Sequence, residues 1–153
     1  MIQLEKATPE DRQSVNALAM EVHSLHVGWR PDIYEMPREI YPEERFSAAL
    51  ERSELYVARR NGDIVGYAAI KMRSFDWTGM VKRRVLFVDE LSVSAEYRRK
   101  GIGKSVMAGI RKIAQEEGCT DLQLSVYPQN REAVAFYEAC GFFPQSVTMS
   151  TKV

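Results

Sequence analysis

The sequence predicts a single mixed α/β domain that spans residues 1–153. A chain of this length is typical of one domain and can bury a substantial core. Its apolar residues change repeatedly between the two-residue period of strands and the longer period of helices. The dipeptide Asn61-Gly62, between two apolar runs, is a strong hairpin signal. These observations indicate strands in hairpin succession with helices packed against them.

The first third of the chain is predicted to contain one strand and two helices. Residues Ile2–Lys6 alternate as a short strand, and Thr8 is a suitable N-cap for a helix that ends near Leu25. The apolar residues of this helix recur at helical spacing and predict its buried face: Val15, Leu18, Ala19, Val22 and Leu25. A long loop, His26–Pro37, precedes a second helix at Pro42–Glu51, and loops of this length are often functional.

The middle of the chain is predicted to form three strands. Residues Leu55–Arg60 and Asp63–Met72 flank the hairpin dipeptide, so we expect them to be antiparallel neighbours. A longer turn at Ser74–Met80 leads to a third strand that includes Phe87–Val93. The last third adds two helices and two strands, predicted at Ile102–Gly118, Asp121–Val126, Asn130–Cys140 and Val147–Val153.

Charge and composition exclude several classes of function. The 21 basic and 21 acidic residues cancel, which argues against a nucleic-acid partner. Residues Met1–Lys6 lack the apolar core of a signal peptide, and no apolar run is long enough to cross a membrane. We therefore predict a cytoplasmic protein with no membrane partner.

No metal site is predicted. Cys119 and Cys140 have no metal-ligand spacing and are interpreted as free thiols. His23 and His26 are helical neighbours, but no third ligand is close in sequence.

The segment from Leu91 to Lys104 predicts an anion site where a strand gives way to a helix. The first turn of a helix presents unpaired backbone N–H groups, and Gly101 and Gly103 have no side chain to obstruct a ligand. Two common phosphate motifs do not fit. A P-loop requires glycine where Arg98 stands, and a dinucleotide fingerprint requires glycine at Val106.

Two motifs resemble the GNAT superfamily of N-acetyltransferases. The pattern Arg98-x-x-Gly101-x-Gly103, after Leu91-Ser92-Val93, resembles its acetyl-CoA pyrophosphate loop. The expected second signature follows as Asn130-x-x-Ala133-x-x-Phe136-Tyr137-x-x-Cys140-Gly141-Phe142. The order of predicted elements matches that fold along nearly the whole chain. The resemblance implies a mostly antiparallel sheet of six or seven strands, a parallel splayed central pair, and about four helices.

The resemblance also implies where acetyl-CoA, the acyl donor, would bind. The strand residues Leu91, Ser92 and Val93 would contact the pantetheine arm, and Asn130 and Tyr137 would meet it from the later helix. The pyrophosphate would lie on the loop formed by Arg98, Arg99, Lys100, Gly101, Ile102, Gly103 and Lys104.

Two catalytic roles are predicted for direct transfer to an amine. By the family pattern, the Tyr137 hydroxyl approaches the thioester sulfur and acts as general acid; the alternative is a packing tyrosine.

Glu90 is the preferred general base, acting directly or through water, because a free alkyl amine is protonated at neutral pH. Asp89 is the weaker alternative, and a structural role for Glu90 remains open. On a regular strand Glu90 shares a face with Val88 and Ser92, although a bulge would change this.

The acceptor is predicted only as a small-molecule or peptide amine. Candidate residues for binding it are His26, Trp29, Tyr34 and Trp77, because aromatic side chains suit a cationic amine. An alternative function is a non-catalytic acyl-CoA sensor or regulatory module. A homodimer is possible, and the sequence does not locate its interface.

Overall fold

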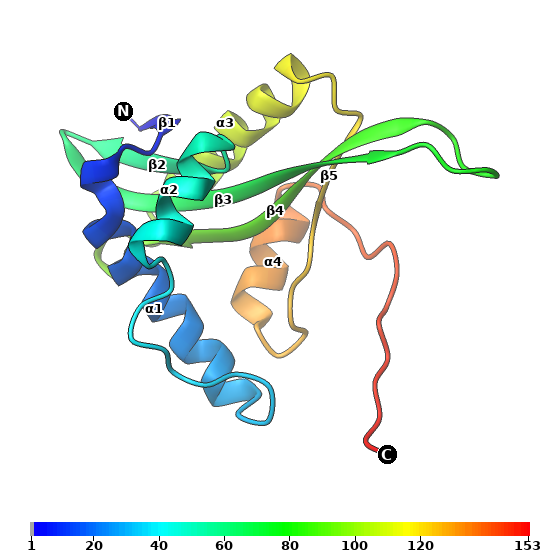
Figure 1. Cartoon of the computed structure of the whole chain (residues 1–153), viewed down its shortest axis with the longest axis horizontal. Coiled ribbons are helices and arrows are strands. Elements are labelled where there is room, and N and C mark those ends of the chain that lie inside the picture. Colours follow the sequence, from blue (N-terminus) through cyan, green and yellow to red (C-terminus); the bar gives the residue numbers. More distant parts are fainter. Residues whose placement is uncertain (1) are drawn as a thin grey trace.

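The computed structural model describes residues 2–153 and consists of one mixed sheet with helices on both faces (Figure 1). Its strands are β1 (Gln3–Lys6), β2 (Leu55–Arg60), β3 (Asp63–Phe75), β4 (Arg83–Val93) and β5 (Asp121–Leu124). Its helices are α1 (Arg12–Trp29), α2 (Glu43–Glu51), α3 (Ile102–Glu116) and α4 (Arg131–Ala139). Single 3₁₀ turns, Pro9–Asp11 and Ala95–Tyr97, precede α1 and α3.

The strands lie in sequence order, β1-β2-β3-β4-β5, and the first four are antiparallel to their neighbours. The predicted hairpin at Asn61-Gly62 is confirmed. Asn61 has φ 52° and Gly62 has φ 87°, the left-handed values that a tight two-residue hairpin turn requires.

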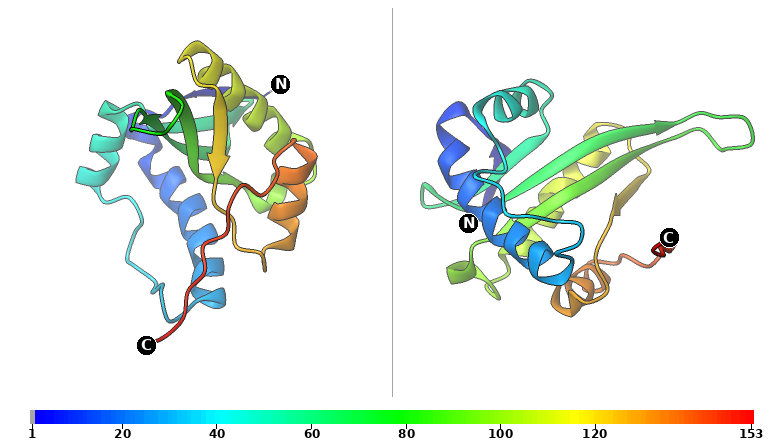
Figure 2. Two further views of the ribbon diagram at one scale, coloured as in Figure 1. Left: turned by 90° about the vertical axis from the view of Figure 1, so that its right-hand side faces the viewer. Right: turned by 60° about the horizontal axis from the view of Figure 1, so that its bottom comes forward.

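Two hydrophobic cores hold the helices to the sheet (Figures 1 and 2). On one face, Val15, Leu18 and Phe46 of α1 and α2 pack against β2 and β3. On the other face, residues of α3 such as Val106 and Ile110 are fully buried against the sheet, and α4 packs beside them. The sheet is therefore a rigid platform between two layers of helix.

A β-bulge in β4 sets the direction of the predicted catalytic carboxylate. Glu90 pairs with Ala69, whereas Val88 pairs with the next residue of β3, so Asp89 is left without a partner. The extra residue reverses the alternation of side chains. As a result Val88 and Leu91 both face the α3 side. Glu90 points to the α1 side, away from Val88, so the pattern expected of a regular strand does not apply and the bulge changes the face of Glu90.

β4 and β5 are parallel, as predicted. They pair at their start and then separate. Their pairing runs from Val85↔Asp121 to Val88↔Leu124 and stops there. β4 continues to Val93 without β5 beside it, so its free edge opens onto the space between the two strands. β5 ends at Leu124, two residues before the predicted Val126, and the chain then leaves the sheet.

Two further predictions are corrected at the ends of elements. α1 extends to Trp29 rather than to Leu25, and its last turns project beyond the sheet. Leu25 lies in these turns, where it lines an open cavity, and is 46% exposed instead of buried. The segment Val147–Val153 is extended but forms no strand, so the described sheet has five strands rather than six or seven. Apolar side chains stand at positions 147, 149 and 153 and polar ones between them, but no strand among residues 2–153 pairs with its backbone.

An ion pair fastens the start of α1 to the sheet. Both carboxylate oxygens of Asp11 accept hydrogen bonds from Arg59 Nη2 of β2, at 2.7 and 2.8 Å. The backbone N–H of Thr8 donates to the same carboxylate at 2.8 Å. Asp11 is 5% exposed, and burial alone would raise its pKa. The hydrogen bonds from Arg59 and Thr8 outweigh this effect and hold the pKa below its usual value.

Within residues 2–153, none of the helices combines the length and apolarity needed to cross a membrane.

Candidate active site

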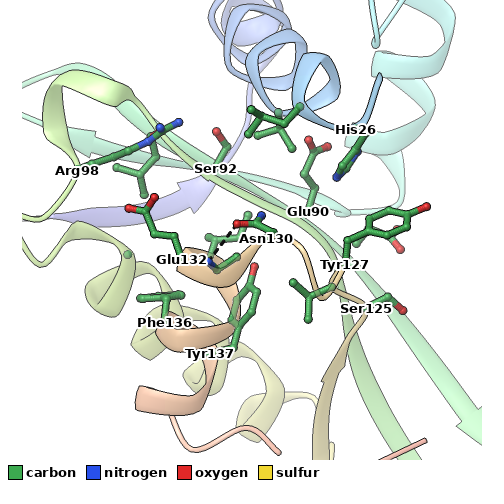
Figure 3. A pocket seen from close by; sticks show the side chains of 18 of the residues that line it. His26, Glu90, Ser92, Arg98, Ser125, Tyr127, Asn130, Glu132, Phe136 and Tyr137 are labelled. Atoms are coloured by element: carbon green, nitrogen blue, oxygen red, sulfur yellow. Dashed lines mark hydrogen bonds between the residues drawn. The ribbon is translucent and has the colours of Figure 1, made fainter. Parts of the chain in front are cut away.

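A cavity of about 870 Å³ opens where β4 and β5 separate (Figure 3). Its walls come from the C-terminal half of α1, the end of β4, the loop before α3, the segment after β5, and α4. The predicted site residues that line it are His26, Trp29, Tyr34, Glu90, Leu91, Ser92, Val93, Arg98, Arg99, Gly101, Gly103, Lys104, Asn130 and Tyr137. The fold thus brings together segments that lie far apart in sequence.

One end of the cavity has the features of an anion site. The N-cap of α3 is Gly101, whose φ of 78° favours glycine, and the first turn of α3 follows it. Arg98, Arg99 and Lys104 line the same end and are exposed. The positive end of the helix dipole and three cationic side chains therefore face one space.

Two predicted loop residues lie outside this cavity lining. Ile102 is 3% exposed and belongs to the core between α3 and the sheet. The Lys100 ammonium lies over the ring of Tyr97, 5.5 Å from its centre. Their backbone atoms belong to the loop and helix start at the anion site, but their side chains do not line the cavity.

Gly103 has a packing role that the motif alone does not reveal. A Cβ atom at this position would lie 3.0 Å from Cε1 and Cζ of Phe136. The absence of a side chain therefore lets α4 approach the first turn of α3 closely. This contact joins the two family motifs in space.

The free edge of β4 offers unpaired backbone donors. Ser94 N donates to Val65 O of β3, so the N–H groups of alternate residues point to β3 and those between them point away. By this alternation the N–H groups of Leu91 and Val93 point to the side that β5 has left. The hydroxyl of Ser92 is buried without a hydrogen-bond partner in the described residues.

Tyr137 enters the cavity from α4, pointing towards β4 (Figure 3). Asn130 begins this helix, and its side-chain oxygen accepts a hydrogen bond from Ala133 N at 3.2 Å. Burial, with the Cys140 thiol and the Glu90 carboxylate nearby, raises the pKa of Tyr137 to about 12. The phenol is therefore protonated at neutral pH and available as a donor.

Glu90 enters from β4 on the α1 side (Figure 3). Burial raises the pKa of its carboxyl group, while the Tyr67 hydroxyl and the positive charges of His23 and Arg45 partly oppose the shift. Tyr67 itself is fully buried, and its hydroxyl makes no hydrogen bond of ordinary geometry in the described residues, so it acts on the Glu90 carboxylate from slightly beyond hydrogen-bond distance. A raised carboxyl pKa is the direction expected of a proton acceptor.

Aromatic rings enclose the other end of the cavity. The centre of the His26 ring lies 5.3 Å from that of Tyr34, 5.8 Å from that of Tyr127 and 5.9 Å from that of Trp29. The hydroxyls of Tyr34 and Tyr127 are hydrogen bonded at 2.8 Å. Burial and the neighbouring His23 lower the pKa of His26. No spacing in the sequence connects Tyr127 to the other rings, so only the fold identifies it.

Trp77 does not lie in this site, contrary to the prediction. It is 59% exposed in the turn between β3 and β4, where its ring packs against Phe75. The β3–β4 hairpin carries this turn away from the cavity (Figure 1). Trp77 was a candidate because an aromatic side chain suits a cationic amine, but the paired arms of β3 and β4, which reach Phe75 and Arg83, hold this turn away from the cavity.

Among the described residues, no group of three or more His, Cys, Asp or Glu side chains could hold a metal ion.

The fold and the cavity define a protein of the acyltransferase type. A family model described as "Acetyltransferase (GNAT) family" matches residues 20–142. The match covers most of the chain, which therefore belongs to this family. Both sequence motifs lie within or at the edge of the matched range.

Two relatives with named activities match part or most of the chain. The chain is 31% identical over 78 residues to thialysine N-epsilon-acetyltransferase of Bos taurus, a match that covers 51% of this chain and 44% of the relative. It is 24% identical over 136 residues to aminoglycoside N(6')-acetyltransferase type 1 of Stenotrophomonas maltophilia, which covers 89% and 87% of the two chains. The chain thus spans less than half the length of the first of these relatives.

A solved structure shares the fold over its full length. A mutant form of the protein BH1408 from Bacillus halodurans superposes with a TM-score of 0.91 and 26% identity, and the match covers 99% of both chains.

Proposed function

We propose that the protein is an N-acetyltransferase that transfers the acetyl group of acetyl-CoA to a primary amine by direct attack in a ternary complex. The observation that carries the proposal is a single cavity that combines three features. These are a cationic helix N-terminus, a free strand edge, and a protonated phenol opposite a carboxylate. Membership of the acetyltransferase family supports the same reaction.

Acetyl-CoA fits the cavity chemically. Its pyrophosphate suits the first turn of α3, where N–H groups and the side chains of Arg98, Arg99 and Lys104 provide positive potential. Its pantetheine arm carries amide groups that can pair with the free N–H groups of Leu91 and Val93. The thioester would then lie between β4 and Tyr137.

The transfer requires one bond to form and one to break. The amine nitrogen attacks the acetyl carbonyl carbon, and the C–S bond breaks to release a thiolate. A backbone N–H on the free edge of β4 would stabilise the developing oxyanion. Glu90 accepts the proton that the amine loses, directly or through water. Neither cysteine lines the cavity, which supports direct attack rather than an acyl-enzyme.

Tyr137 would assist the departure of the thiolate. With a pKa of about 12 the phenol keeps its proton at neutral pH. It therefore donates a hydrogen bond to the sulfur as negative charge develops, and when its proton passes to the thiolate the phenolate takes a proton back from solvent.

The acceptor amine would enter between His26, Trp29 and Tyr34. These rings and the Glu90 carboxylate suit an amine on an organic scaffold, because a cation is attracted to aromatic faces and to negative charge. The named relatives act on thialysine and on aminoglycosides, both of which carry primary amines, so these compounds are the first acceptors to test.

The test is amine-dependent release of free thiol from acetyl-CoA. The wild-type protein and a Glu90→Gln variant are assayed with a panel that includes thialysine, lysine peptides and aminoglycosides. The proposal predicts turnover with at least one amine and a large loss of kcat in the variant, with acetyl-CoA binding preserved.

Two results would count against the proposal. Tight binding of acetyl-CoA with no thiol release across the panel would indicate a non-catalytic sensor. Full activity of Glu90→Gln would remove Glu90 from its assigned role.

A further inference from the structure

A single hydrogen bond joins two walls of the cavity at its aromatic end. One wall is α1 with the loop that follows it, which carries Tyr34, and the other is the segment after β5, which carries Tyr127. Their hydroxyls lie 2.8 Å apart, although the two residues are 93 positions apart in the sequence. Among residues 2–153, no other hydrogen bond links residues 12–42 to residues 121–142. We call this pair the tyrosine bridge.

The first wall holds its tyrosine firmly. Tyr34 N donates to Arg30 O at 2.9 Å, and Arg30 N donates to His26 O at 2.8 Å, so Tyr34 continues the end of α1. His23 Nε2 of the same helix lies 2.7 Å from Glu35 O and fastens the next residue of the loop. Movement of Tyr34 away from the cavity therefore requires movement of this whole corner.

The second wall holds its tyrosine in a similar way. Asn130 N donates to Tyr127 O at 3.0 Å, and Asn130 is the N-cap of α4. Pro128 follows directly and restricts the backbone of Tyr127 to extended conformations. The tyrosine bridge thus connects the end of α1 to the helix that carries Tyr137.

The rings at the bridge leave no open passage between the walls. The ring centres of Tyr34 and Tyr127 are 6.2 Å apart, and that of His26 lies 5.3 and 5.8 Å from them. These separations are those of rings in direct contact. His26 and Tyr127 approach each other from the two walls, beside Glu90 (Figure 3). An amine that enters between the rings must part them and break the hydrogen bond.

We propose that the tyrosine bridge is a gate that selects the acceptor by its width and favours a primary amine at the end of an unbranched chain. A slender chain can pass after small rotations of the rings, whereas a ring or a branched scaffold requires the two walls to separate. The gate acts on the acceptor of the proposed acetyl transfer and therefore rests on that function.

The cost of opening the gate sets the size of the expected effect. The apparent affinity for a wide acceptor is reduced to the fraction of molecules in which the gate is open. Removing one hydroxyl removes one neutral hydrogen bond, which corresponds to a change of roughly fivefold in the open population. The hydroxyls of Tyr34 and Tyr127 bond only to each other among the described residues, so loss of either has the same consequence.

The experiment compares two primary amines with the same number of carbons, n-heptylamine and cyclohexylmethylamine. Thiol release from acetyl-CoA is measured with the wild type, Tyr34→Phe, Tyr127→Phe and the double variant. Tyr97→Phe is the control, because Tyr97 does not line the cavity. Each single variant keeps its ring, and folding is checked by circular dichroism.

We expect the wild type and the control to prefer n-heptylamine. In each single variant the ratio of kcat/KM for the wide amine to that for the slender amine should rise about fivefold, through a lower KM for the wide amine. The double variant should show the same rise and not the product of two, because both changes break one bond. An unchanged ratio, or a double variant in which the two effects multiply, would overturn the gate.

Hydrogen exchange gives a second readout that needs no turnover. The amides of Tyr34 and Asn130, each bonded within its own wall, should exchange faster in either single variant than in the wild type and the control. Unchanged exchange at both amides would overturn the gate. Faster exchange in the variants with no thiol release from any protein would instead contradict acetyl transfer and support the bridge between the walls.

Discussion

At the scale of single residues, the bulge at Asp89 is the feature that makes the site possible. On a regular strand, with Asp89 paired in the ladder, Glu90 would point with Val88 into the core on the α3 side. With the bulge, Glu90 faces α1 and lines the cavity, while Leu91 and Val93 stay packed against the α3 side. The bulged backbone at Asp89 therefore separates the Glu90 carboxylate from the core.

Replacing Tyr137 by phenylalanine tests the proposed donor. The change removes the hydroxyl but keeps the ring that packs against Phe142. We expect kcat to fall roughly 10²-fold, the usual contribution of a positioned acid, with little change in acetyl-CoA affinity. Tyr97→Phe is a matched control, because Tyr97 does not line the cavity. Unchanged kcat in Tyr137→Phe would mean that another group assists the thiolate.

The pH dependence of kcat/KM tests Glu90 and its neighbours. Activity should rise with pH as Glu90 loses its proton, with a midpoint above the ordinary value of 4.5 because burial raises this pKa. The Tyr67 hydroxyl favours the charged carboxylate, so Tyr67→Phe should raise the pKa further and move the acidic limb to higher pH. A limb that stays in place or moves to lower pH would contradict this arrangement. His23, Arg45 and Asp89, the other charged groups that act on Glu90, are unchanged in the variant.

At the scale of elements, sequence periodicity predicted the buried helices well and the element ends less well. Val106 and Ile110 of α3 are fully buried, as their spacing indicated. Leu25 continued the apolar stripe of α1 but lies in turns that extend past the sheet. Periodicity indicates which residues share a helix face, but it does not indicate where the sheet that covers this face ends.

The ion pair between Asp11 and Arg59 should matter for the stability of the first helix. Asp11→Asn removes a buried charge that accepts bonds from Arg59 and Thr8, and we expect a loss of roughly 2–3 kcal/mol in the free energy of unfolding. Urea titration of both proteins measures the difference. A change below about 0.5 kcal/mol, the scale of surface substitutions, would contradict the assigned role.

The same pair predicts how stability changes in acid. The folded-state pKa of Asp11 lies below the ordinary value of 3.8, so its stabilisation is present above that pH. It is lost as the pH falls from 3.8 through the lower folded value. Asp11→Asn should therefore lose less stability than the wild type over this acid range.

At the scale of the whole molecule, the two motifs predicted the fold and the residues that line the anion end of the cavity more reliably than those at its aromatic end. Gly101 and Asn130 mark helix starts, and helix starts can be recognised from local sequence. Trp77 was misplaced and Tyr127 was missed, because their positions depend on the reach of a long hairpin and on the path of the chain after β5. Such long-range geometry leaves no local pattern.

The predicted last strand illustrates a different limit. Apolar residues recur at positions 147, 149 and 153, but a strand also needs a neighbour, and none of the strands in residues 2–153 pairs with this segment. Local pattern therefore predicts the extended conformation of this segment but not whether it pairs.

The most direct test of the central claim is calorimetric titration of the protein with acetyl-CoA. The wild type is compared with Arg99→Glu combined with Lys104→Glu, which reverses two charges at the anion end of the cavity, and with Lys112→Glu as control. Lys112 lies on the same helix, outside the cavity. Saturable binding by the wild type and the control, with a large loss in the double variant, is the predicted result. No binding by the wild type, or equal binding by all three proteins, would contradict an acetyl-CoA site at the start of α3.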